Sequence, residues 1–268
     1  MPTLPSSPAS PEPHRARHVA ESFGADPERY DRTRPRYPQE LVDAIIAASP
    51  GRDVLDVGIG TGVPARPFQA AGCRVLGVEV DARMAEFAHE HEFAVEVATF
   101  EDWDPAGRTF DAIIAGMTWH WIDPAAGTNK AARLLRPDGR LAVFWNIGQP
   151  PPDLGAAFCE VYQRVLPDTP FARTPSDPLA AYERLFTKTA HEIEQVDAFS
   201  PPERWQFDWE HRYTTREWLQ QIPTFGGHSQ FPPPTLDELL AGIAGAIDAT
   251  GGSFTMRYAA VAITASRQ

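Results

Sequence analysis

Short apolar runs alternate with helical patterns through the first half of the chain. Runs with the length of buried strands cover 53–57, 74–80, 94–98, 110–115 and 141–145. Apolar side chains recur at helical spacing over 39–48, 63–71, 82–91 and 124–135, with a turn expected at 137–139. This alternation predicts an α/β fold, with a parallel sheet covered by helices on both faces.

The pattern changes after Asn146, where Gly-Gln-Pro-Pro-Pro over 148–152 interrupts the alternation. Helices are expected over 156–166 and 235–249, the second opened by a Thr235–Glu238 capping box. Residues 254–264 alternate and read as a closing strand, with 193–199 as its antiparallel partner. We therefore expect an inserted substrate-capping region within the fold.

These changes divide the chain into four kinds of segment. Residues 1–16 are expected to be a disordered tail, because proline, serine and alanine bury little apolar area. Residues 17–50 are expected to form an N-terminal lid and the first helix. The core is assigned to 51–147 and 190–268, and the substrate-cap insertions to 148–189 and 205–250.

Composition narrows the classes of partner. The 268 residues are 43% hydrophobic and carry a net charge of −12, which disfavours nucleic acid, whose partners normally present a basic face. There is neither an apolar run of about 20 residues nor a signal peptide, so we expect a cytoplasmic protein with no membrane contact. Cys73 and Cys159 fit no disulfide framework or metal cluster, so both are interpreted as packing residues and no metal is expected. The oligomeric state stays open.

The strongest chemical signal is VLDVGIGTG, residues 54–62, at the turn from the first strand to the next helix. Glycines there let the backbone approach a ligand, and free N–H groups at a helix start face it. Glu79 ends the next strand about 20 residues later, where its carboxylate can accept bonds from a ribose. A nucleoside ligand is indicated, but the G-x-G-x-x-G spacing of dinucleotide sites is absent.

The motif Asp-x-Gly-x-Gly-x-Gly resembles the first motif of class I S-adenosylmethionine-dependent methyltransferases. VLGVEVDARM, ATFEDWD and LLRPDGRLAVFWN are similar to later motifs of that superfamily. YDRTRPRYP, the Trp-His-Trp element and RYTTREWLQQIPTFGGH resemble a bacterial small-molecule group related to trans-aconitate methyltransferases. The resemblance implies a Rossmann-like, seven-stranded, mostly parallel sheet, S-adenosylmethionine as cofactor, and a small-molecule acceptor.

The resemblance also implies a set of cofactor-binding residues, with Glu79 on the ribose, Asp81 capping the next helix and Met84 against the adenine. An N-terminal segment is expected to fold over the cofactor. Arg34 in it pairs with a carboxylate of the cofactor or of the acceptor, or else is an ordinary surface arginine. The full set is Asp56, Gly58, Gly60, Gly62, Glu79, Val80, Met84, Thr99, Phe100, Glu101, Ala115, Gly116, Tyr30 and Arg34.

The loop 116–122 follows the fourth strand and is expected beside the transferred methyl group, because ligands lie beyond the carboxyl ends of the strands. His120 is the candidate general base. The alternative is that Trp119 and Trp121 pack the loop and His120 holds a backbone carbonyl.

Aromatic enrichment of the insertion favours an apolar acceptor, although any single residue there also fits a packing role. The candidate substrate-binding residues are Trp119, Tyr37, Trp145, Trp218, Phe225 and His228. His228 follows two glycines and is interpreted either as part of a gate or as an exposed loop residue.

The function predicted from these signals is methyl transfer to a small molecule, most plausibly at oxygen. Two alternatives remain. One is a non-catalytic protein that binds S-adenosylmethionine, and the other is a nicotinamide-dependent oxidoreductase, which the glycine spacing disfavours.

Overall fold

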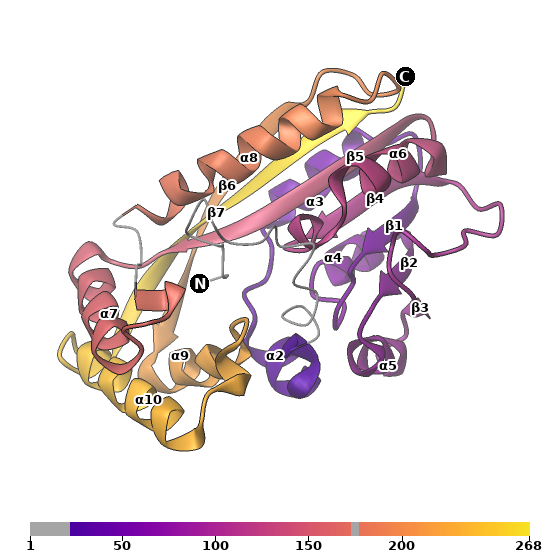
Figure 1. The fold of residues 1–268 in the computed structure, drawn as a ribbon. Coiled ribbons are helices and arrows are strands. Elements are labelled where there is room, and N and C mark those ends of the chain that lie inside the picture. The colour runs from indigo at the N-terminus through magenta and orange to yellow at the C-terminus, as the bar shows by residue number, and fades with distance from the viewer. Residues whose placement is uncertain (1–21, 173–176) are drawn as a thin grey trace. The chain divides into compact units, whose positions relative to one another are not determined.

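A computed structural model describes residues 22–172 and 177–268, so the tail expected over 1–16 lies outside the described residues (Figure 1). The strands are β1 Asp53–Val57, β2 Arg74–Glu79, β3 Ala94–Val97, β4 Phe110–Gly116, β5 Leu135–Gln149, β6 Glu203–Thr214 and β7 Ser253–Ser266. The α-helices are α2 Pro27–Thr33, α3 Gln39–Ala47, α4 Ala65–Ala70, α5 Ala82–Glu90, α6 Pro124–Leu134, α7 Pro152–Val165, α8 Pro178–Glu194, α9 Thr215–Gln221 and α10 Pro233–Asp248. Short 3₁₀ turns include Trp119–Trp121, Ile222–Thr224 and His228–Gln230.

The seven strands form one sheet in the order β3-β2-β1-β4-β5-β7-β6. The pairs β1–β2, β2–β3, β1–β4 and β4–β5 are all parallel. The sequence prediction of a Rossmann-like α/β fold is thus confirmed. The chain leaves β1 towards β2 and β3, then returns to place β4 on the other side of β1. Ligands in such sheets bind at this switch point, outside the carboxyl ends of the strands.

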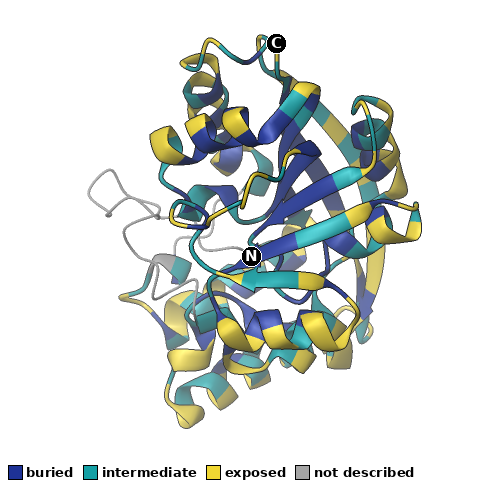
Figure 2. Cartoon of the chain, turned by 90° about the vertical axis from the view of Figure 1, so that its right-hand side faces the viewer, coloured by how far each residue is buried: buried dark blue, intermediate teal, exposed yellow. Residues whose placement is uncertain are grey.

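The central strands carry no polar face. All residues of β4 and most of β1 are buried, which matches their nearly continuous apolar sequence and the dark strands of Figure 2. Asp81 is the N-cap of helix α5, and its side chain accepts the backbone N–H of Arg83 at 3.0 Å, as predicted for a helix cap. Helix α5 packs on β2 and β3, and α4 packs on β2.

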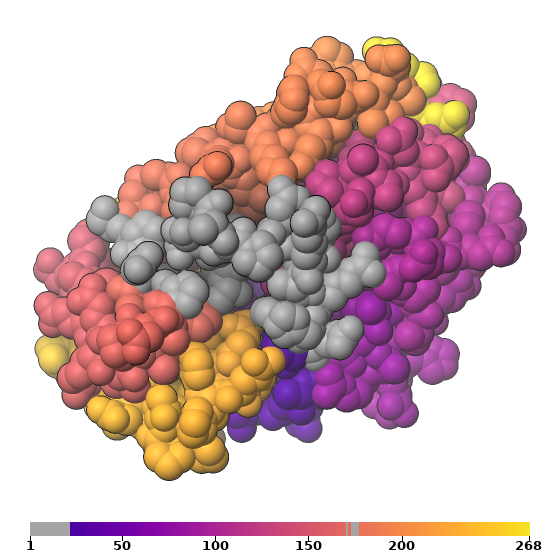
Figure 3. Space-filling model, in the orientation of Figure 1, coloured from indigo at the N-terminus to yellow at the C-terminus, as the bar shows by residue number. Residues whose placement is uncertain are grey.

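By internal contacts the chain divides into two compact units. Unit 2 comprises 35–146, 183–207 and 260–268, and it contains β1 to β4 with the glycine-rich turn. Unit 1 comprises the described parts of 1–34 and 147–182, together with 208–259. Unit 1 has its own apolar core, in which α7 packs against α10. The surfaces of these two segments lie side by side in Figure 3, in salmon and gold. The core includes Leu154, Phe158, Trp218, Phe225, Leu239, Ile243, Ile247, Phe254 and Met256.

The strand expected over 193–199 is wrong. Residues up to Glu194 continue helix α8, with Ile193 fully buried, and Phe199 makes only an isolated antiparallel bridge to Arg267. The missed strand is β6, at one edge of the sheet. Its sequence, ERWQFDWEHRYT, alternates aromatic with charged or polar residues, which is the period of a strand with one solvated face.

Two local predictions are also corrected. Helix α10 begins two residues before Thr235, with Pro232 as the N-cap and no side-chain cap, because a proline at the first helical position needs no N–H partner. The turn expected at 137–139 lies within β5. Asp138 there has φ 61°, and the register with β4 shifts between Phe110 and Ala112, so the segment is a bulge in a continuous strand.

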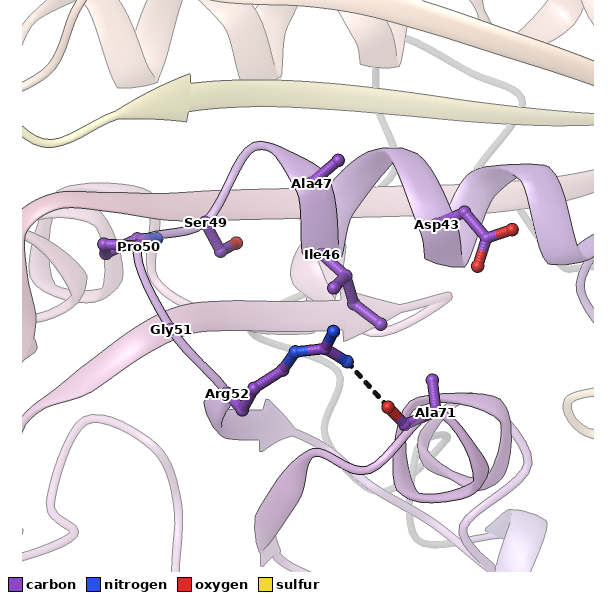
Figure 4. A pocket seen from close by; sticks show the side chains of 8 residues that line it. All are labelled: Asp43, Ile46, Ala47, Ser49, Pro50, Gly51, Arg52 and Ala71. Atoms are coloured by element: carbon purple, nitrogen blue, oxygen red, sulfur yellow. Dashed lines mark hydrogen bonds between the residues drawn. The ribbon is translucent and has the colours of Figure 1, made fainter.

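A hollow opens at the amino end of β1, lined by the end of α3, residues 49–52 and Ala71 (Figure 4). Arg52 crosses it and donates to the carbonyl oxygen of Ala71 at 2.6 Å. The glycine-rich turn lies at the other end of β1, after Val57, so the hollow is separate from the predicted site. Within 22–172 and 177–268, no helix is long and apolar enough to cross a membrane, and no cluster of three metal-ligating side chains occurs.

Candidate functional site

The glycine-rich turn after β1 has three glycines with positive φ: 69° at Gly58, 57° at Gly60 and 88° at Gly62. A Cβ at Gly58 would lie 2.2 Å from the Thr118 side chain, and one at Gly62 would lie 2.5 Å from Phe93. At Gly60 the nearest atom would be the Met84 methyl carbon at 3.6 Å. Packing therefore requires glycine at Gly58 and Gly62, whereas a Cβ at Gly60 would make only an ordinary van der Waals contact with Met84.

Asp56 lies on β1 directly before this turn and is fully buried. Among the described residues, neither of its carboxylate oxygens has a hydrogen-bond partner. Burial, and secondarily the nearby charge of Glu79, raises the pKa of Asp56 well above its ordinary value. A buried carboxylate left without donors is costly, so Asp56 is available to a ligand that brings a positive charge or N–H groups.

Glu79, the last residue of β2, is buried and accepts three backbone hydrogen bonds. Its Oε2 accepts Gly60 N–H at 2.8 Å, and its Oε1 accepts the N–H groups of Val80 and Asp81, each at 2.9 Å. Burial raises the pKa of Glu79, and these bonds oppose the shift. The carboxylate is thus oriented by the backbone of the two strand ends that it joins.

The turn after β3 holds the residues expected near an adenine. The Thr99 hydroxyl donates to Asp102 at 2.8 Å, and the buried Phe100 ring lies 6.2 Å from the Trp119 ring. Lys130, from α6, reaches under this turn and donates to the carbonyl oxygens of Glu101, at 3.1 Å, and of residue 103. Glu101 Oε1 in turn accepts the N–H of residue 123 at 2.9 Å. These bonds fix the turn against α6.

The loop after β4 begins with a left-handed residue. Met117 has φ 58°, its N–H donates to the Phe144 carbonyl at 2.8 Å, and its sulfur accepts the N–H of Asn146 at 3.2 Å. Thr118 donates its hydroxyl towards the carbonyl oxygens of Gly58, at 3.3 Å, and Gly116, at 3.1 Å. The loop is therefore attached both to β5 and to the glycine-rich turn.

His120 pairs with Trp145 in this loop. The indole Nε1–H of Trp145, on β5, donates to Nδ1 of His120 at 3.3 Å. Trp145 is fully buried and His120 half-buried. Burial lowers the pKa of His120 to about 4, so the ring is neutral near pH 7.

Two further predicted residues of unit 2 have mainly packing contacts. Trp119 is buried, and among the described residues its indole N–H has no partner. The Tyr37 ring meets Phe144 edge-on at 4.9 Å, and the neighbouring Arg36 carbonyl accepts the amide of Asn146 at 3.0 Å. The segment after Pro35 is thereby attached to β5.

In unit 1, the Arg34 side chain lies among aromatic rings. Its guanidinium carbon is 4.5 Å from the Tyr30 ring centroid and 5.5 Å from that of Phe225, and it donates to the Thr224 carbonyl. No described carboxylate forms an ion pair with it, and Arg34 Nε is buried without a partner among the described residues. The alternative of an ordinary solvated arginine is disfavoured.

His228, also in unit 1, is buried rather than exposed in a loop. Its Nε2 lies 3.0 Å from the Tyr162 hydroxyl and its Nδ1 lies 3.4 Å from the Gly226 carbonyl. Both ring nitrogens are thus used within the unit, and Phe225 packs edge-on at 5.5 Å. Trp218 is likewise a core residue of unit 1. These contacts favour packing roles for the three.

The structure therefore gathers the unit 2 candidates around adjacent strand ends. Asp56, Gly58, Gly60, Gly62, Glu79, Val80, Met84, Thr99, Phe100, Glu101, Ala115, Gly116, Trp119, His120, Trp145 and Tyr37 all lie in unit 2, and Tyr30, Arg34, Trp218, Phe225 and His228 in unit 1. Sequence reasoning missed Thr118, Lys130 and Tyr162. Thr118 lies two residues after the end of β4, and that position alone was an available signal for it.

Comparisons with known proteins agree with this geometry. Residues 55–143 match the family described as a methyltransferase domain. An uncharacterized methyltransferase of Mycobacterium tuberculosis (strain H37Rv) is 35% identical over 132 residues, covering 48% of this chain and 54% of that protein. Nocamycin O-methyltransferase of Saccharothrix syringae is 36% identical over 127 residues, covering 43% and 44%. The family match over 55–143 contains the glycine-rich turn, Glu79 and the loop with His120.

Among solved structures, a putative type II methyltransferase from Anaeromyxobacter dehalogenans superposes with a TM-score of 0.62. It is 25% identical and covers 87% of this chain and 97% of its own. The chain spans about half the length of the curated relatives it matches. The likeness in fold therefore extends over most of the chain, while the family match over 55–143 lies within unit 2.

Proposed function

We propose that the protein is a class I S-adenosylmethionine-dependent methyltransferase that acts on a small-molecule acceptor at oxygen, because residues 55–143 match the family described as a methyltransferase domain. The observation that carries the proposal is the fully buried Asp56 carboxylate, without a described partner, at the end of β1. S-adenosylmethionine brings an ammonium group and a ribose diol, and both are hydrogen-bond donors. Asp56 and Glu79 supply two buried carboxylates, which fit these donors.

When bound, S-adenosylmethionine supplies a methyl group on an electrophilic sulfonium. The residues of this chain bind, align and exclude water, which are the main contributions to such a displacement. Gly60 leaves space for the ligand, Glu79 takes the ribose, and Met84 packs against the base. Thr99, Phe100 and Glu101 are proposed to line the adenine, with Val80, Ala115 and Gly116 completing the pocket.

Arg34 stays a proposed partner for a carboxylate. Its buried Nε and the absence of a described acidic neighbour support an anion there. Arg34 is partly buried, and a buried N–H without an acceptor is unfavourable, so binding a carboxylate of the cofactor or of the acceptor would relieve that cost. A relation to trans-aconitate methyltransferases and a cytoplasmic location also stay predictions.

Titration calorimetry tests the proposal with S-adenosylhomocysteine, S-adenosylmethionine and NAD. We expect both adenosyl ligands to bind the wild-type protein. Glu79→Gln should weaken them about 10- to 150-fold, the loss of one hydrogen bond to a charged group. Glu90→Gln, an exposed carboxylate on α5, is the matched control.

Each alternative has its own result in this assay. Binding of NAD with no response to the adenosyl ligands would favour an oxidoreductase. Tight binding of S-adenosylmethionine, together with no transfer of a labelled methyl group to a metabolite pool, would favour the non-catalytic alternative.

A further inference from the structure

The hydrogen bond between Trp145 and His120 fixes which imidazole nitrogen carries the proton. An indole N–H only donates, so Nδ1 of His120 accepts from it at 3.3 Å. A neutral imidazole has one accepting and one protonated nitrogen, so the proton of His120 sits on Nε2. The ring is therefore set up to donate through Nε2.

This arrangement leaves His120 poorly suited to remove a proton. The lone pair that a base would use belongs to Nδ1, where Trp145 already binds. Burial lowers the pKa of His120 to about 4, which further weakens it as a base. His120 is also the sole titratable side chain in the segment Met-Thr-Trp-His-Trp-Ile, residues 117–122.

The position of the ring is well defined. Trp145 follows Phe144, which pairs with Gly116 in the parallel register of β4 and β5. Two residues later on the loop, Thr118 is bonded to the Gly58 carbonyl of the glycine-rich turn. His120 is thus bonded to Trp145 on β5, and it lies two residues along the chain from Thr118, which contacts the glycine-rich turn.

We propose that His120 is a neutral hydrogen-bond donor that positions the acceptor through Nε2–H, and that the acceptor's reacting oxygen is already ionised at neutral pH. This inference rests on the proposed methyltransferase function. Acceptors of this chemistry are carboxylic acids and acidic phenols or enols. Among the described residues none accepts a hydrogen bond from His120 Nε2, which leaves this donor for a ligand.

The reaction balances without a base. A lone pair of the ionised oxygen forms the new carbon–oxygen bond while the carbon–sulfur bond breaks, and that electron pair goes to sulfur. The anionic oxygen becomes a neutral ester or ether oxygen, and the sulfonium becomes a neutral thioether. No proton is transferred, so the step requires a donor that holds the oxygen in line rather than an acceptor for a proton.

Nitrogen-15 NMR of histidine-labelled wild-type protein, alone and with S-adenosylhomocysteine, tests the donor directly. The His120 signals are assigned by their loss in His120→Gln, with His191→Gln on α8 as the control. We expect the Nε2-protonated neutral ring to persist from pH 8 down to about pH 5. A proton on Nδ1, or a charged ring between pH 6 and 7, would overturn the proposal.

A turnover assay supplies the second readout, with labelled S-adenosylmethionine and carboxylic acids, each paired with its primary alcohol. We expect methylation of acids, at a rate independent of pH from 6 to 9. His120→Gln, whose amide donates at similar reach, should retain turnover within about tenfold, whereas His120→Ala should lose about 10- to 150-fold, mainly through KM. Methylation of the alcohols, with equal losses in both variants and a rate that rises with pH, would refute the donor role.

The donor role of His120 and the proposed methyltransferase function would be refuted by different results. The NMR readout needs no acceptor, so it decides the state of His120 whatever the turnover panel contains. Absence of S-adenosylhomocysteine binding in calorimetry would instead remove the proposed function itself.

Discussion

Asp56→Asn is expected to make the ligand-free protein more stable and the ligand-bound protein less so. In the wild type, burial raises the pKa of Asp56, because the charged form has lost water and gained no donor from the described residues. A group whose pKa is raised by folding stabilises the protein below its unfolded pKa. That contribution is lost as the pH rises through the folded pKa. The amide of the variant has no charge to bury.

The magnitude follows from the cost of an unsatisfied buried polar group. Removing the charge while keeping the shape should add about 1–2 kcal/mol to the free energy of unfolding at pH 8. For a chain of this size, that is roughly 2–8 °C in Tm. At pH 4, which is close to the ordinary aspartate pKa of 3.8, Asp56 is protonated in the folded chain and about half protonated in the unfolded chain, so the difference should be small.

Thermal unfolding at pH 8 and pH 4, with and without S-adenosylhomocysteine, measures both effects. The ligand stabilises in proportion to RT ln(1 + [L]/Kd), and the variant should bind about 10- to 150-fold more weakly. Saturating ligand should therefore reverse the order of the two Tm values. Asp237→Asn, an exposed carboxylate on α10, should change neither quantity.

One result would refute this reasoning: an Asp56→Asn protein that is folded, no more stable than wild type at pH 8, and unaltered in its affinity for S-adenosylhomocysteine. The buried carboxylate would then have neither an energetic cost nor a ligand to offset it.

Three further predictions concern the turn and unit 1. Gly60→Ala should fold but bind S-adenosylhomocysteine at least about tenfold more weakly, because its Cβ enters the ligand space; calorimetry should show no such loss for Gly72→Ala, which also replaces a glycine of positive φ, here 84°. Tyr162→Phe should lower the free energy of unfolding by about 1–3 kcal/mol in urea titration, because it leaves His228 Nε2 without its donor; unaltered stability would contradict the assigned bond. Burial lowers the pKa of His228 to about 3, so its stabilising contribution is complete above pH 6.5 and is lost as the pH falls towards 3; His228→Gln should flatten that part of the curve of stability against pH.

The sheet was readable because its central strands are buried on both faces. A short, continuous apolar run such as β4 has the length of a strand buried on both faces. The glycine-rich turn at Gly58 predicts where a ligand would bind. Strand β6 was missed because residues 205–250 were assigned to a substrate-cap insertion, although Phe207 and Trp209 alternate with Gln206 and Asp208. The aromatic composition of this segment was given more weight than its alternation of aromatic with polar residues, which is typical of a strand.

Candidate site residues could be predicted from the sequence where each one depends on the end of a single strand. Asp56 and Glu79 each follow from one strand and its turn. The bond from Trp145 to His120 joins residues 25 apart and depends on the register of β4 with β5, which a sequence pattern does not specify. The partnership of Tyr162 with His228 spans 66 residues and two helical segments, so it was equally out of reach.

Thr118 makes the two halves of the unit 2 site communicate. Its one hydroxyl is directed at the Gly58 carbonyl of the glycine-rich turn and at the Gly116 carbonyl at the end of β4. A ligand that shifts the turn alters the bond that holds the loop, and by thermodynamic reciprocity an acceptor that shifts the loop alters affinity at the turn by the same factor. Donor and acceptor would then bind as a coupled pair, and a single threonine would set how strongly each reports the presence of the other.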